Sequence, residues 1–192
     1  MRWLVLAGAL AQGVAPANTT LTAVSGIKVG HHTLTDRPTG CTVIIIEDGV
    51  PEIIQTVWKI PAAGNIADNF WRPGNVIAAI EADSGAVSRI VQGTGPDQAV
   101  LTAHPDTGQT LQGLVLPHWQ RIKALCLEQA MVFAELRYQS WDIAICAEGP
   151  VVVEVNTGAA FSLSQIALGE GFLTDRFRRF LVNAGFGKLA VK

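Results

Sequence analysis

Three oxygen-bearing side chains in the C-terminal part of the chain, Asp142, Glu154 and Asn156, are spaced so that one β-hairpin would bring them together. Two carboxylates held close together repel each other unless a cation lies between them. A small set of hard oxygen ligands suits Mg²⁺, which keeps water or substrate phosphates in its remaining octahedral positions. The pattern therefore predicts a Mg²⁺ or Mn²⁺ site formed by these three residues.

The hairpin itself is predicted from two apolar runs, residues 143–146 and 150–155, that flank Ala147-Glu148-Gly149. A three-residue loop ending in Gly is typical of a type I turn with a bulge. Because side chains alternate between the faces of a strand, that loop fixes the register. The pairs expected are Cys146 with Pro150, Ile145 with Val151, Ile143 with Val153, and Asp142 with Glu154. The apolar face would carry Ile143, Ile145, Val151, Val153 and Val155.

Elsewhere the chain shows the patterns of an α+β fold. Strands are predicted at 42–46 and 53–59, and a hairpin at 76–81 and 86–91 around Asp83-Ser84-Gly85. Pro117 begins a helix that runs through Arg137, and shorter helices follow at 163–168 and 173–182. The helical repeat consists of Trp119, Ile122, Cys126, Ala130 and Phe133. We expect an antiparallel sheet of β-hairpins with helices packed on one face.

Several motifs resemble one family. The spacing from Asp142 to Glu154-x-Asn156 resembles the metal-binding end of ATP-grasp ligases, in which an acidic residue and the E-x-N pair hold Mg²⁺ against the phosphates of ATP. Other segments look like the ATP-grasp proteins associated with sugar transfer or polysaccharide gene clusters, in the same order along residues 51–181. They are Ala67-Asp68-Asn69-Phe70, His104-Pro105-Asp106-Thr107-Gly108, Leu116-Pro117-His118-Trp119, and residues 141–165.

This resemblance implies a fold like the C-terminal lobe of ATP-grasp enzymes and a ligase activity that depends on ATP and Mg²⁺. A carboxylate would be activated as an acyl phosphate and captured by an amine or a similar nucleophile. The partners implied are ATP and a small carboxylate or saccharide-linked substrate, as in polysaccharide biosynthesis. An ATP-grasp site normally lies between two lobes, and the sequence shows no earlier lobe and no Gly-rich phosphate loop. We therefore expect the site to be incomplete. A half-fold exposes apolar surface that would pack on the missing lobe, so we also expect the chain to self-associate.

The N-terminal part has a different character. Residues 1–17 read as a short secretory signal peptide, or alternatively as an apolar first strand, and their apolar stretch is too short to span a bilayer. Residues 18–50 resemble the start of DmpA-type self-processing aminopeptidases, which leaves 51–192 as a partial ATP-grasp domain. Two alternatives stay open: a fragment of a secreted N-terminal-nucleophile aminopeptidase, and a non-catalytic interaction domain.

Further polar residues have both a functional and a structural interpretation. Lys59 and Arg89 could bind phosphate, although such residues at strand edges are more often solvated. Asp68 and Asn69 could line a substrate pocket or form an Asx-turn, and His104 could act as a base or simply hold a turn.

Composition limits the remaining classes. The 192 residues are 49% hydrophobic and 16% charged, which allows one modest core. A net charge of −2 gives no basic surface for nucleic acid. Three cysteines without a CxxC pair favour reduced thiols, and with the ATP-grasp resemblance they favour the cytoplasm. A genuine signal peptide would instead mean a secreted or periplasmic protein.

Overall fold

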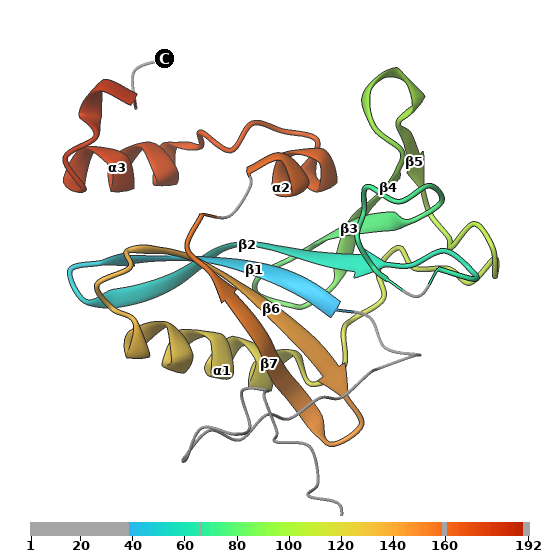
Figure 1. Cartoon of the computed structure of the whole chain (residues 1–192), viewed down its shortest axis with the longest axis horizontal. Helices are drawn as coiled ribbons and strands as arrows, with labels where there is room; N and C mark the ends of the chain where they lie inside the picture. Colours follow the sequence, from blue (N-terminus) through green and yellow to red (C-terminus); the bar gives the residue numbers. More distant parts are fainter. Residues whose placement is uncertain (1–38, 66, 159–160, 190–192) are drawn as a thin grey trace, which may run out of the picture. The chain divides into compact units, whose positions relative to one another are not determined.

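The computed structural model describes residues 39–65, 67–158 and 161–189 of the chain. These residues form one seven-stranded antiparallel sheet with the order β5-β4-β3-β2-β1-β6-β7 (Figure 1). The predicted signal peptide and residues 18–38 of the peptidase-like segment lie outside the described residues. The strands are β1 (Thr39–Glu47), β2 (Val50–Ile60), β3 (Val76–Ile80), β4 (Val87–Gln92), β5 (Ala99–Leu101), β6 (Tyr138–Cys146) and β7 (Gly149–Asn156).

Three α-helices accompany this sheet in the described part of the chain: α1 (Trp119–Val132), α2 (Phe161–Leu168) and α3 (Asp175–Asn183). Single 3₁₀ turns lie at Gly95–Asp97 and Gly187–Leu189. The α+β class and the antiparallel sheet predicted from the sequence are confirmed. Helix α1 ends five residues earlier than predicted. There the side chain of the buried Gln139 on β6 donates to the carbonyl groups of Ala130 in the last turn, of the C-cap Phe133 and of Leu136 beyond it.

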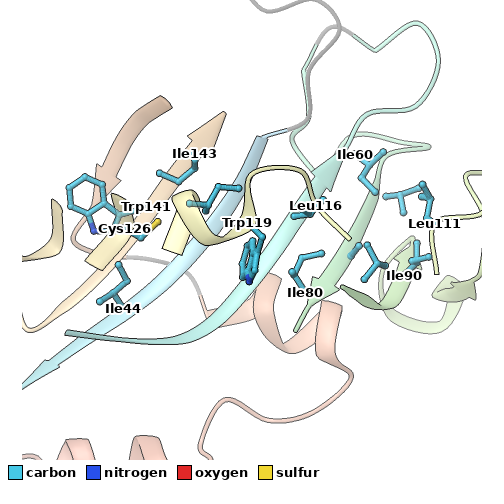
Figure 2. Packing of buried hydrophobic residues seen from close by; sticks show 14 of the residues in the cluster. Ile44, Ile60, Ile80, Ile90, Leu111, Leu116, Trp119, Cys126, Trp141 and Ile143 are labelled. Carbon is cyan, nitrogen blue, oxygen red and sulfur yellow. The ribbon is translucent and has the colours of Figure 1, made fainter. Parts of the chain in front are cut away.

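The helices cover both faces of the sheet, whereas the sequence analysis placed them on one. Helix α1 packs Trp119, Ile122, Cys126 and Ala130 on one face, in a cluster that includes Ile44, Trp141 and Ile143 (Figure 2). Helices α2 and α3 lie on the opposite face (Figure 1), where Ala167 joins one apolar cluster and Phe177 and Phe180 join another.

Strand β1 shows why both faces need a cover. Its residues Val43, Ile44, Ile45 and Ile46 are all at most 3% exposed, and successive side chains of a strand point to opposite faces. Ile44 and Ile46 pack in the α1 cluster, while Val43 and Ile45 pack with the aromatic residues of α3. A continuous apolar run of this kind is typical of a strand that is buried on both sides.

Strand β1 also occupies the centre of the sheet, between β2 and β6. Residue 50, where the sequence analysis placed a segment boundary, is the first residue of β2 and pairs with Glu47 at the end of β1. The sheet is therefore continuous across that position. This arrangement puts residues of β2 and β6 on either side of β1, and it positions the candidate site.

Candidate metal and phosphate site

The β6–β7 hairpin brings Asp142 directly opposite Glu154, as predicted, but through a different register. Cys146 pairs with Gly149, so the loop contains two residues, Ala147 and Glu148. The predicted pairs Cys146–Pro150, Ile145–Val151 and Ile143–Val153 are wrong, and the observed partners are Gly149, Pro150 and Val152. A β-bulge after Asp142–Glu154 takes up the one-residue difference.

The bulge also changes which valines face the core. Val152 and Val155 pack against the α1 cluster, whereas Val151 and Val153 are 51% and 57% exposed. The prediction that Val151 and Val153 point inward is therefore wrong, because a one-residue shift of register turns a side chain to the other face. Ile143 and Ile145 pack in the core as predicted.

Lys59 lies beside the two facing carboxylates. Its Nζ atom is 3.2 Å from Oδ1 of Asp142 and 4.0 Å from Oδ2 of Asp68. The side chains of Lys59 and Asp142 are 15% and 14% exposed, so this ion pair is largely shielded from solvent. The contact is possible because β2 and β6 flank β1: Lys59 pairs with Thr39, and Asp142 pairs with Cys41, two residues further along β1.

The two carboxyl groups differ in their electrostatics. Burial raises the pKa of Asp142, and its hydrogen bond with Glu154 adds to this rise, while the Lys59 ammonium opposes it. The hydrogen bond from Asn156 to Glu154, 3.0 Å from Nδ2 to Oε1, lowers the pKa of Glu154, and the contact with Asp142 lowers it further. For Lys59, burial would lower the pKa, but Asp142 and Asp68 outweigh it and the pKa is raised. Lys59 is thus a charged internal counter-ion of this acidic pair.

A pocket of about 180 Å³ opens between the polar face of the hairpin and the start of α2. Its lining includes Lys59, Asp142 and Asn156 from the predicted site, together with Cys41, Ser140 and Ser164. The Cys41 Sγ and Ser140 Oγ atoms are 2.6 Å apart, and burial raises the pKa of the Cys41 thiol. Sequence reasoning missed Cys41 and Ser140 as lining residues, because only the pairing of β1 with β6 brings them together.

The remaining predicted site residues lie in other surroundings. Arg89 Nη1 donates to the carbonyl oxygens of Ile166 and Ala167, at 2.7 and 2.8 Å, and so holds the end of α2. Asn69 accepts a hydrogen bond from the Trp71 amide at 3.1 Å, as in an Asx-turn. His104 Nε2 lies 3.3 Å from the Pro61 carbonyl oxygen. The structure does not bring these three residues to the Lys59–Asp142 pair.

Asp68 does reach the site, and a residue absent from the predictions positions the loop that carries it. Asn75 is 1% exposed, and its Oδ1 accepts from the Ala62 amide at 2.8 Å. Its Nδ2 donates to the carbonyl oxygens of Ala67 and Asn69 at 2.9 and 2.8 Å. This amide therefore fixes both ends of the turn around Asp68. In the sequence, the position of Asn75 directly before the apolar strand β3 could have indicated a buried structural role.

Comparison with known protein families identifies the family of the chain. Residues 10–180 match the model of the family described as sugar-transfer associated ATP-grasp. The chain belongs to this family. The match confirms the resemblance stated from the sequence, and it also spans residues 18–50, the segment that resembles a DmpA-type peptidase.

No curated protein and no solved structure matches the chain. In the described ranges no helix is long and apolar enough to cross a membrane, and no group of three or more His, Cys, Asp or Glu side chains is arranged to hold a metal ion.

Proposed function

We propose that Lys59, Asp142, Glu154 and Asn156 form the metal and phosphate end of a MgATP site, and that the protein is an ATP-dependent ligase. In this proposal ATP activates a carboxylate as an acyl phosphate, and an amine or similar nucleophile captures it. The observation that supports it is the direct pairing of Asp142 with Glu154 beside the Lys59 ammonium, where Lys59, Asp142 and Asn156 line the pocket and Glu154 lies exposed next to it. The family match supports the nucleotide class.

The donor atoms at this position fit Mg²⁺ or Mn²⁺ in their chemistry. Asp142 and Glu154 lie directly opposite each other, so their carboxyl groups can approach one cation from two strands. Asn156 turns its Nδ2 toward Glu154, and its Oδ1 is the neutral oxygen of the set. Mg²⁺ commonly binds through one or two carboxylates and completes its shell with water and substrate phosphates. When bound, the metal would neutralise phosphate charge, and Asp142, Glu154 and Asn156 would hold it.

Lys59 would act on the phosphates in the same site. Phosphoryl transfer depends mainly on positioning and on stabilising the charge of the transferred group. A largely buried ammonium is well suited to this, because its interactions are screened less by solvent than those of a surface lysine. In the structure Lys59 is held by Asp142 and Asp68. Nucleotide binding would transfer part of that interaction to phosphate oxygens.

The substrate in this proposal is a small or saccharide-linked carboxylate and the setting is polysaccharide biosynthesis; the sugar-transfer association of the family supports a saccharide-related role. Asp68 is the predicted substrate residue that lies at the site, since its carboxylate is 4.0 Å from Lys59. Asn69 and His104 instead stabilise their own loops, through the hydrogen bonds with the Trp71 amide and the Pro61 carbonyl oxygen described above.

Thermal melts with and without Mg²⁺ and ATP test this proposal. A ligand that binds only the native state raises its stability by mass action. Metal should therefore raise the melting temperature of the wild type, and ATP should add to the rise only when metal is present. Glu154→Gln keeps the shape and removes the charge, so it should abolish the metal response, whereas Asn156→Ala should only weaken it.

Glu148→Gln is the matched control, since this exposed residue on the β6–β7 turn carries the same charge outside the site. It should respond to metal like the wild type. Equal metal-dependent shifts in the wild type and in Glu154→Gln would mean that the triad does not hold the metal.

A further inference from the structure

A second pocket, of about 210 Å³, lies on the same side of the sheet as α2 but is lined by other residues. Its floor comes from β2 and the end of β3, and its cover comes from the segment that joins α2 to α3 (Figure 1). Gln55 and Glu81 line it from the sheet side, and Leu168, Glu170 and Phe172 line it from the helix side. The pocket shares no lining residue with the Lys59–Asp142 pocket.

Gln55 is the unusual residue of this pocket. Its side chain is only 8% exposed, and its Oε1 atom is buried with no hydrogen-bond partner among the described residues. A buried acceptor without a donor costs about 1–3 kcal/mol of stability. Native proteins usually satisfy such groups, so an unpaired one needs an explanation. Because Gln55 lines the pocket, a donor from outside the chain, either water or a bound ligand, can reach this oxygen.

The other polar groups of the pocket indicate the charge of that donor. Glu81 and Glu170 are exposed, and neither takes part in the ion pairs formed within the described part of the chain. Two hydroxyl groups in the lining are already engaged, since Ser88 donates to the Ala79 carbonyl and Thr174 accepts from the Phe177 amide.

Arg89, the nearby cation, binds carbonyl groups of α2 and is not in the lining. The charged groups of the pocket are therefore both anionic, while the buried hydroxyl of Thr56, which has no partner among the described residues, can donate or accept.

We propose that this pocket binds the ammonium group of a small organic amine, with Gln55, Glu81 and Glu170 as acceptors. An ammonium group has three donors and one positive charge, which match one amide oxygen and two carboxylates. Leu168 and Phe172 provide apolar walls for a short hydrocarbon chain.

The volume limits the size of the amine. At about 210 Å³ the pocket is smaller than the 300–1,000 Å³ that is usual for drug-sized ligands, so it suits a molecule of a few heavy atoms. Gln55 and Lys59 lie four residues apart on β2, which corresponds to about 13 Å along a strand. The amine site is therefore separate from the proposed phosphate site, and the inference does not depend on nucleotide binding.

The test is a titration of the full chain with n-butylammonium chloride, followed by ¹H–¹⁵N correlation spectra at constant ionic strength. Saturable shifts should be confined to residues 54–56, 80–82 and 168–174. The neutral analogue n-butanol should bind weaker by a factor on the order of ten, because it loses the charge-assisted hydrogen bonds. Shifts that do not saturate, or equal binding of n-butanol, would overturn the proposal.

Variants identify the groups that bind. Glu81→Gln and Glu170→Gln should each weaken n-butylammonium binding on the order of tenfold, since each removes one anion and keeps the shape. Glu128→Gln, an exposed residue of α1 on the opposite face of the sheet, is the matched control and should bind like the wild type. If both pocket variants titrate like this control, the carboxylates do not hold the amine.

Gln55→Leu separates binding from folding. It removes an unpaired buried oxygen, so the stability of the free protein should be kept or raised, while n-butylammonium binding is lost. A folded Gln55→Leu protein that binds the amine as tightly as the wild type would contradict the role of Gln55.

Discussion

Replacing Lys59 by Met should destabilise the free protein, because it removes the internal counter-ion of Asp142 and keeps the length of the side chain. Breaking a buried ion pair by removing one partner costs about 3–5 kcal/mol. Here the cost is reduced, since the raised pKa of Asp142 lets this carboxyl take up a proton once Lys59 is gone. We expect a loss of about 2–3 kcal/mol, which for a chain of this size lowers the melting temperature by about 4–12 °C.

The same variant should respond more strongly to metal than the wild type. In the wild type Lys59 and a bound cation compete for Asp142, so Mg²⁺ has to displace part of the existing ion pair. Without Lys59 the acidic pair has no internal cation, and Mg²⁺ should recover a larger share of stability. In contrast, Lys59→Met should weaken the additional effect of ATP, because the phosphates lose their ammonium partner.

Thermal melts of the wild type and of Lys59→Met, each with and without Mg²⁺, measure both effects. Lys123→Met is the matched control, because Lys123 pairs at 3.6 Å with the fully exposed Asp83 on the other side of the molecule from the site. Exposed pairs contribute little, so its melting temperature should change much less. The reasoning is refuted if Lys59→Met melts like Lys123→Met, or if its response to Mg²⁺ is no larger than that of the wild type.

Four further substitutions test the framework of the site. Gln139→Leu should cost about 1–3 kcal/mol in a denaturant titration, because it removes the amide that donates to the Ala130, Phe133 and Leu136 carbonyls and leaves the buried indole NH of Trp141 without its partner. Asn75→Ala should cost about 1–3 kcal/mol and increase amide exchange in the 62–69 loop. Val152→Ala should destabilise by about 1 kcal/mol or more, and Val151→Ala clearly less, in the same titration; the opposite order would contradict the bulged register.

The local part of the site could be predicted from the sequence. Asp142 and Glu154 belong to one hairpin, and their pairing depends only on the loop and on the alternation of side chains. The loop was predicted one residue too long, and the bulge that compensates has no glycine or other marker at Val153. The facing pair was thus predicted correctly although three other pairs of the same register were not.

The contact of Lys59 with Asp142 could not be predicted, because it joins residues 83 positions apart. The contact requires β1 to lie between β2 and β6, and the local sequence patterns of β2 and β6 do not indicate this strand order. For the same reason the pocket residues Cys41 and Ser140 were missed. The two-sided cover of the sheet, by contrast, had a readable signal in the fully apolar run of residues 43–46, which predicts burial on both faces.

The most direct test of the central proposal is to locate the metal by paramagnetic broadening. Mn²⁺ is added stepwise to the ¹⁵N-labelled protein, and the loss of amide signals is followed for each residue. Because the broadening falls steeply with distance from the ion, the proposal predicts that residues 140–142 and 154–156 lose intensity first. The Glu154→Gln protein should show no such selective loss. Selective broadening at another part of the chain, or equal broadening of these residues in Glu154→Gln, would contradict the assignment of Asp142, Glu154 and Asn156 as the metal site.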